Sequence, residues 1–100
     1  MDVKTEQKAE EWSVQVRFEE NGVRTAAHVT LVAGERRVKA HGSARRNPVD
    51  PDLPRVGEDL ALARALSSLA HELVGDAIAR LEEATGEPAD VLAGEESTAW

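Results

Sequence analysis

Residues 12–31, WSVQVRFEENGVRTAAHVTL, contain the pattern that decides the fold of this 100-residue chain. From residue 12 to residue 19, apolar and polar side chains alternate without a break. The apolar side chains of this stretch are Trp12, Val14, Val16 and Phe18. A period of two, rich in β-branched and aromatic residues, predicts a half-buried strand with one face on a core and the other in water.

An Asn-Gly pair follows this strand at residues 21 and 22. The pair suits a two-residue type I′ turn, because both of its residues tolerate positive φ angles. A turn closed between Glu20 and Val23 predicts an antiparallel second strand whose less polar face lies beside the apolar face of the first. The expected neighbours are Phe18 with Thr25, Val16 with Ala27, Val14 with Val29, and Trp12 with Leu31.

A second reversal is expected at residues 33–36, where Gly34 suits the first central position of a type II′ turn. The expected neighbours are Leu31 with Val38, Val29 with Ala40, Ala27 with Gly42, and Thr25 with Ala44. The inner face of the third strand is small, so another element can pack closely against it. Its outer face carries Arg37, Lys39, His41, Ser43 and Arg45.

A loop and then one long helix are expected after the strands. Residues 47–57, NPVDPDLPRVG, contain three prolines and two aspartates, which predicts a loop. The helix is expected to begin at Glu58 and Asp59, since the helix dipole favours acids in the first turn. It should end at Thr85, because Gly86 suits the position after a helix and Pro88 cannot continue one. At this length, the helix either overhangs the sheet or bends near Gly75.

The helix is expected to cover the apolar face of the sheet with residues at helical spacing. These are Leu62, Leu66, Leu69, Ala70, Leu73, Ala77 and Leu81. Leu66 and Leu69 should lie against Val14, Val16 and Val29. The opposite, solvent-facing side of the helix is expected to be acidic, with Glu58, Glu72, Asp76 and Glu83.

Leu60, Val74 and Ile78 widen the apolar arc of this helix to nearly half of its circumference. A three-stranded sheet offers little surface for so wide an arc. Two covers remain open: the loop of residues 47–57 folded back over the flank, or a second copy of the chain in a two-fold dimer. Leu60, Val74 and Ile78 are therefore the candidate residues for self-association.

The fold class predicted is α+β: a three-stranded antiparallel meander with one long C-terminal helix packed on one face. One domain is expected over residues 11–86, with a disordered segment at 1–10 and an acidic, disordered tail at 87–100. The absence of cysteine excludes disulfides, thiolate nucleophiles and cysteine-based zinc sites. No signal peptide or apolar run long enough for a membrane is found, so a cytoplasmic protein without a membrane partner is expected.

Several stretches resemble a small uncharacterised protein family known mainly from actinobacteria. They are residues 12–16 (WSVQV), 25–27 (TAA), 42–50 (GSARRNPVD) and 57–70 (GEDLALARALSSLA). The resemblance covers roughly residues 12–75. It implies a β-β-β-α fold similar to the double-stranded-RNA-binding domain, without that domain's leading helix. The family is one of unknown function, so the resemblance implies no catalytic or binding residues.

Residues 36–46, RRVKAHGSARR, carry five positive charges and no acid in a chain of net charge −7. Such a segment can contact anions or nucleic acid, and the candidate residues are Arg37, Lys39, Arg45 and Arg46, with Arg17 on the same face. Docking on double-stranded RNA is not expected, because no leading helix is present and the acids at the helix start repel phosphates. The outer face also lacks the aromatic side chains on which single-stranded bases stack.

The favoured interpretation of the basic segment is an edge strand whose charges discourage aggregation. At its end, Arg45 and Arg46 are expected to pair with nearby acids of the loop and helix start, which are Asp50, Asp52, Glu58 and Asp59.

His28 and His41 lie directly opposite each other in the expected register, with Cβ atoms about 5 Å apart. Two imidazoles could share a zinc or copper ion, but the expected neighbours supply no further ligand, so no metal site and no cofactor are expected. Ser67 and His71 are four residues apart on the helix but lack an orienting acid, which argues against a hydrolase.

The sequence therefore predicts a non-enzymatic interaction or self-association module whose partner is itself or another protein. The alternative is nucleic-acid binding through the basic third strand and the following loop.

Overall fold

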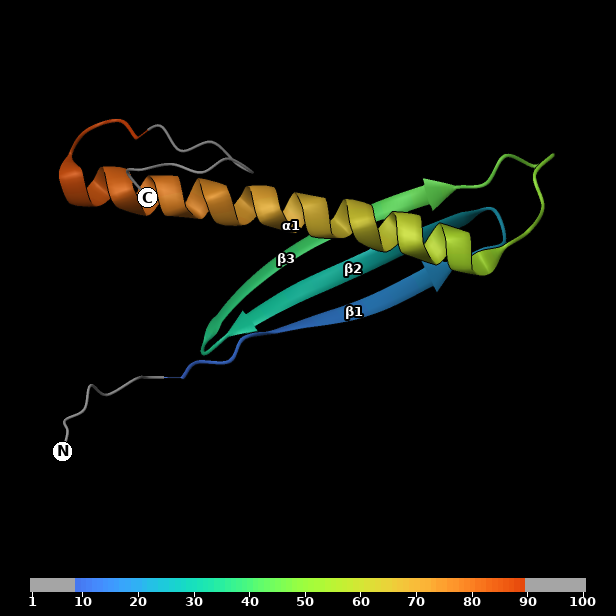
Figure 1. Cartoon of the computed structure of the whole chain (residues 1–100), viewed down its shortest axis with the longest axis horizontal. Helices are drawn as coiled ribbons and strands as arrows, with labels where there is room; N and C mark the ends of the chain where they lie inside the picture. The colour runs from blue at the N-terminus through green and yellow to red at the C-terminus, as the bar shows by residue number, and fades with distance from the viewer. Residues whose placement is uncertain (1–8, 90–100) are drawn as a thin grey trace.

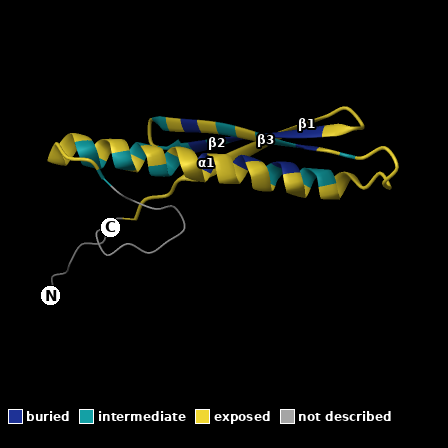
Figure 2. Cartoon of the chain, turned by 90° about the horizontal axis from the view of Figure 1, so that it is seen from above, coloured by how far each residue is buried: buried dark blue, intermediate teal, exposed yellow. Residues whose placement is uncertain are grey.

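The computed structural model describes residues 9–89, which form one sheet and one helix (Figure 1). The elements are β1 (Ser13–Glu20), β2 (Arg24–Ala33), β3 (Arg36–Arg45) and α1 (Pro54–Thr85). The three strands are antiparallel in the order β1-β2-β3, and α1 lies on one face of the sheet (Figure 2). The predicted α+β meander with a C-terminal helix is confirmed. The disorder expected at residues 1–8 and 90–100 concerns segments outside the described residues.

The first hairpin has a register that differs by two residues from the expected one. The pairs are Phe18 with Ala27, Val16 with Val29, and Val14 with Leu31. The expected two-residue turn is wrong because the Asn21 side chain organises a longer connection: its Oδ1 accepts hydrogen bonds from the Val23 and Arg24 amides at 3.1 and 2.8 Å. A shift by two leaves every side chain on its expected face, since the period of a strand is two.

The second hairpin has the register that the sequence predicts. Gly34, the first central residue of the turn, has a φ angle of 67°, whereas Glu35, the second, does not have a positive φ. A type II′ turn requires this combination. The pairs are Leu31 with Val38, Val29 with Ala40, Ala27 with Gly42, and Thr25 with Ala44.

Helix α1 begins at Pro54, four residues before the expected start, so Glu58 and Asp59 are not in its first turn. Proline suits the first helical position because the amide there needs no partner, and Leu53 before it is extended. The helix ends at Thr85 as predicted. Gly86 has the left-handed φ of 74° and its amide donates to the Glu82 carbonyl at 2.7 Å. The helix runs unbroken through Gly75 and extends past the sheet (Figure 1).

The face of α1 that packs on the sheet is centred on small residues. Ala61, Ala65 and Leu69 are buried, whereas Leu66 is 41% exposed. Gly42 of β3 explains this orientation: a Cβ built there would lie 2.8 Å from the Ala61 carbonyl oxygen and in close contact with the Ala65 amide nitrogen. Strand and helix backbones therefore touch at Gly42, as the small inner face of the third strand predicts, and the bulkier leucines turn to the flank.

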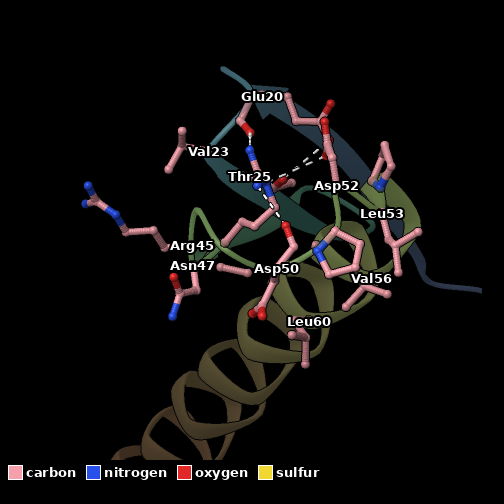
Figure 3. A pocket seen from close by; sticks show the side chains of 16 residues that line it. Glu20, Val23, Thr25, Arg45, Asn47, Asp50, Asp52, Leu53, Val56 and Leu60 are labelled. Atoms are coloured by element: carbon pink, nitrogen blue, oxygen red, sulfur yellow. Dashed lines mark hydrogen bonds and ion pairs between the residues drawn. The ribbon is translucent and has the colours of Figure 1, made fainter.

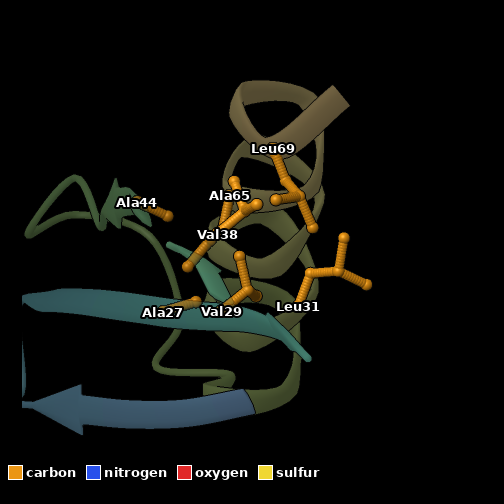
Figure 4. Close-up of a cluster of buried hydrophobic side chains, with 8 residues drawn as sticks. Ala27, Val29, Leu31, Val38, Ala44, Ala65 and Leu69 are labelled. Atoms are coloured by element: carbon orange, nitrogen blue, oxygen red, sulfur yellow. The ribbon is translucent and has the colours of Figure 1, made fainter. Parts of the chain in front are cut away.

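The hydrophobic core lies between α1 and the strands β2 and β3 (Figure 4). Its buried residues are Ala27, Val29, Leu31, Val38, Ala44, Ala61, Ala65 and Leu69, with Ala40, Leu62 and Leu73 partly buried beside them. The expected burial of Leu66 under the helix against Val14 and Val16 is wrong, since all three side chains are more than 40% exposed. One helix about 10 Å wide covers two strands spaced about 5 Å apart and leaves the third open.

The expectation that Asp76 belongs to an acidic outer helix surface is also wrong. Arg36, at the start of β3, reaches up from the inner face of the sheet and binds Asp76 with an N–O distance of 2.9 Å. This ion pair is partly buried and fixes the C-terminal half of the helix over the β2–β3 hairpin. Because both groups keep some solvent contact, we expect only a modest gain in stability from it.

Candidate protein interaction surface

The inner face of β1 carries a row of apolar side chains that nothing in the described chain covers fully. Trp12, before the strand, is 54% exposed, and Val14, Val16 and Phe18 are 43, 41 and 40% exposed. Val14, Val16 and Phe18 point to the same side of the sheet as α1, yet α1 packs on β3 and β2, and Trp12 continues their alternation just before the strand. The row is contiguous, since alternate residues of a strand lie about 7 Å apart on one face.

One flank of α1 borders this row. The Arg64 guanidinium donates to the Ser43 carbonyl at the free edge of β3, with an N–O distance of 2.9 Å, so the Arg64 side of the helix lies toward β3. Leu66 lies two residues further, about 200° around the helix, and therefore on the side toward β1. We call Trp12, Val14, Val16, Phe18 and Leu66 together the β1 apolar surface.

Among residues 9–89, no strand pairs with the outer edge of β1. Order β1-β2-β3 makes β1 an edge strand, and its eight residues pair with β2 in an unbroken register without proline or bulge. The Arg46 amide donates to the Val23 carbonyl and so continues the β2–β3 ladder on odd-numbered residues of β2. By the alternation of antiparallel ladders, even-numbered β2 residues then bond odd-numbered β1 residues. The amides and carbonyls of Val14, Val16 and Phe18 consequently point to the free edge.

The other edge of the sheet is protected. The Arg64 side chain occupies the Ser43 carbonyl of β3, and the outward-facing side chains of this strand include three cations, Arg37, Lys39 and Arg45. Charges of one sign on an edge strand are a common means of preventing strand addition. The described part of the chain thus closes one edge of its sheet and leaves the other edge open beside an apolar face.

Of the residues that the sequence suggested for self-association, Val74 and Ile78 lie one helical turn apart, whereas Leu60 is far from both. Leu60 is 44% exposed, whereas Val74 and Ile78 are partly buried. Along a continuous helix, Val74 lies about 21 Å beyond Leu60. Sequence reasoning missed the β1 apolar surface because it assigned the whole apolar face of the sheet to the helix. The available signal was that one helix is too narrow to cover three strands.

Leu60 instead lines a hollow of about 390 Å³ between the end of the sheet and the start of α1 (Figure 3). The β1–β2 loop, the end of β3 and the loop of residues 46–53 form its other walls. The loop lies beside Leu60, as expected if it folds back over the flank of the helix. Val74 and Ile78 do not line this hollow, so the loop covers only the first part of that flank.

Arg46 holds this end of the molecule together. Its guanidinium donates to the carbonyls of Asp50 at 3.0 Å, Pro48 at 3.4 Å and Gly22 at 3.3 Å, and its Nε lies 3.8 Å from an Asp52 carboxylate oxygen. The expected pairing of Arg46 with an acid of the loop is confirmed. Of the candidate cations for nucleic acid, Arg46 is therefore engaged within the chain, whereas Arg37, Lys39 and Arg45 are exposed.

The outer face of the sheet carries the two histidines that the sequence places opposite each other. His28 and His41 are register partners, and their ring centroids are 6.1 Å apart. The two-residue shift of β1 brings an unexpected neighbour, since Glu19 lies 3.2 Å from His28 Nε2 and 2.9 Å from an Arg17 guanidinium nitrogen. The hydrogen bond from Arg17, and after it that from His28, lowers the pKa of the Glu19 carboxyl below its ordinary value.

Within residues 9–89, no cluster of three or more histidine, aspartate or glutamate side chains is arranged to hold a metal ion. On the helix, the His71 ring bonds the Ser67 backbone carbonyl at 2.9 Å, and the Ser67 hydroxyl takes no part in this bond. In the same part of the chain, no helix combines the length and the apolar character needed to cross a membrane.

Comparison with known proteins places this chain in a family. Residues 10–90 match the family model described as Rv2632c-like. The uncharacterised protein Mb1767 of Mycobacterium bovis is 33% identical over 81 residues, which are 81% of this chain and 86% of that protein. Rv2632c of Mycobacterium tuberculosis is 36% identical over 75 residues, which are 75% of this chain and 81% of that protein.

The crystal structure of Rv2632c has a similar fold, with a TM-score of 0.76 at 33% sequence identity, and the match covers 84% of this chain and 100% of that one. The chain belongs to the Rv2632c-like family, which confirms the resemblance to an uncharacterised actinobacterial family. The matched relatives are themselves called uncharacterised, so membership brings a fold without an assigned activity. The similarity to double-stranded-RNA-binding domains stays an expectation.

Proposed function

We propose that this domain is a non-enzymatic interaction module that self-associates through the β1 apolar surface. The observation that carries the proposal is the row Trp12, Val14, Val16 and Phe18, exposed by two-fifths or more on the face that should be the buried one. Removing such a surface from water is favourable, at roughly 25 cal/mol per Å² of apolar area.

The residue types of this surface suit an interface. Aromatic side chains are enriched at protein contacts because they bring a large apolar area at a small cost in side-chain entropy, and Trp12 and Phe18 stand at the two ends of the row. Charged side chains are depleted at interface cores, and none lies within the row. Contiguous exposed apolar patches on a domain of this size mark interaction sites.

The test is the mass of the protein in solution at about 50 μM, where contacts of micromolar affinity are occupied. We expect light scattering to give about twice the chain mass of 10.8 kDa. Val16→Asp should give the monomer mass, because it places a charge in the centre of the surface. Val49→Asp is the matched control, since Val49 is 85% exposed in a loop away from this surface.

Circular dichroism shows whether Val16→Asp remains folded. The milder double variant Val14→Thr, Val16→Thr keeps the shape and the β propensity of both side chains and should weaken the dimer at least tenfold. A wild-type protein that remains monomeric at about 50 μM would contradict the proposed function.

A second candidate function, nucleic-acid binding, rests on the outer face of the sheet. There, Arg17, His28, Lys39 and His41 line a shallow hollow, and Arg37 extends the same basic surface. The apolar aromatics Trp12 and Phe18 lie on the opposite face, so contact would depend on phosphates rather than on base stacking.

This second candidate predicts that the wild type binds an oligonucleotide at about 50 mM salt, measured by fluorescence anisotropy, and loses the affinity steeply as salt rises. Arg37→Glu with Lys39→Glu should abolish binding. Arg55→Glu with Arg80→Glu changes the net charge equally on the helix and should retain it. The absence of any wild-type binding at low salt would remove this candidate.

A further inference from the structure

We propose that two chains join by antiparallel pairing of their β1 strands, which forms one sheet of twice three strands with both helices on the same face. This inference rests on the proposed self-association and names the partner as a second copy of this chain. It accounts for the open backbone edge of β1 and brings the two apolar rows into lateral contact with each other.

The backbone supplies the first part of the geometry. The amides and carbonyls of Val14, Val16 and Phe18 point to the free edge, and an identical strand running in the opposite direction presents the same groups. A two-fold axis midway between the two strands and perpendicular to the sheet therefore satisfies these groups mutually, as in any antiparallel pair. Pairing by β3 is disfavoured, because the Arg64 side chain binds the Ser43 carbonyl at that edge and the outer face of the strand carries three cations that would repel a second copy.

The side chains select the register. With the axis at Gln15, Val14 pairs with Val16 of the second copy and Trp12 pairs with Phe18, so all four apolar residues meet apolar residues. On the outer face Gln15 meets Gln15 and Ser13 meets Arg17. An axis at Arg17 instead places two guanidiniums opposite each other, which destabilises a strand pair. An axis at Val16 places Trp12 opposite Glu20.

This register also places the apolar rows of the two β1 strands next to each other on the inner face of the sheet. Each apolar row gains a parallel row about 5 Å away on its open side, with aromatic and β-branched neighbours. The Leu66 flank of each helix stands on the far side of its own row. Face-to-face stacking of two β1 strands would cover the same side chains but would leave both edges unpaired and would place the two Gln15 side chains on opposite outer faces.

Because the chain contains no cysteine, a single introduced thiol tests the register. In Gln15→Cys, the paired thiols should lie across from each other with Cα atoms about 4.5 Å apart, within the range that a disulfide requires. The matched control is Ser13→Cys on the same face of the same strand. Its two copies would be about 13 Å apart, too far for a disulfide.

We expect mild oxidation of Gln15→Cys at about 50 μM to give a covalent dimer on non-reducing electrophoresis, at least tenfold more than Ser13→Cys under the same conditions. Equal cross-linking of the two variants, or none in Gln15→Cys while the wild type is a dimer by light scattering, would overturn the strand pairing and leave the proposed function standing. A monomeric wild type would overturn both.

Discussion

Replacing Gly42 by alanine is expected to destabilise the domain by about 3 kcal/mol, the upper end of the usual cost of overpacking. The added Cβ would lie 2.7 Å from the Arg64 carbonyl carbon and 2.8 Å from the Ala61 carbonyl oxygen, and closer still to the Ala65 amide nitrogen. All three atoms belong to the helix backbone, so no side-chain rotation relieves the clash. The helix has to move away from β3, which loosens the contacts of the buried core.

Gly75→Ala is the matched control for this prediction. A Cβ at Gly75 meets no heavy atom within 4 Å, and alanine is favoured over glycine in a helix by up to about 1 kcal/mol. Urea unfolding of both variants and the wild type, at one fixed protein concentration, gives the free energies of unfolding to compare. A Gly42→Ala variant within about 0.5 kcal/mol of the wild type would show that strand and helix backbones do not touch at this position.

The strands show how far local sequence signals reach. The second hairpin could be predicted pair by pair, because Gly34 and the alternation on both sides of it specify a single turn. The first hairpin deviates by two residues, since Asn21 uses its side chain to bind the Val23 and Arg24 amides, and the sequence pattern is equally compatible with both connections. The shift of two residues did not affect the prediction of which side chains face the core. It also left His28 opposite His41, because both lie in the second hairpin.

The rotation of the helix could not be obtained from hydrophobicity alone. Periodicity favours the leucine-rich stripe around Leu66, whereas the structure places Ala61 and Ala65 at the centre because Gly42 admits them to close contact. The sequence did contain a usable signal: the inner face of β3 is small at Gly42, and the helix has two alanines four residues apart, Ala61 and Ala65, that can pack against it. The interaction surface was missed for the same reason, since a helix centred on β3 leaves β1 uncovered.

These two observations connect folding with assembly. A helix that packs closely on β3 at Gly42 cannot also extend over Val14 and Val16. Tight packing on β3 therefore leaves the inner face of β1 uncovered. A single 100-residue chain has no further element among its described residues to fill the open side. We therefore regard the uncovered strand as a consequence of the fold, and a second copy as the partner that pairs its open edge and shields part of its apolar row.

The rotation of the helix has a direct consequence for two leucines only three residues apart. Leu69→Ala should lower the free energy of unfolding by about 2–5 kcal/mol, as for other buried leucines, because Leu69 is 5% exposed within the core cluster that includes Val29 and Val38. Leu66→Ala makes the same chemical change on the flank, where the side chain is 41% exposed, and should cost less than about 1 kcal/mol.

The comparison of these two variants by urea unfolding tests the helix orientation independently of Gly42. Both substitutions replace leucine by alanine in the middle of α1, so changes in helix propensity cancel between them. Circular dichroism at one protein concentration is sufficient, because only the difference between the two free energies matters. Equal losses, or a larger loss for Leu66→Ala, would mean that the leucine-rich stripe faces the sheet, that Ala61 and Ala65 do not contact β3, and that β1 is covered by the helix of its own chain.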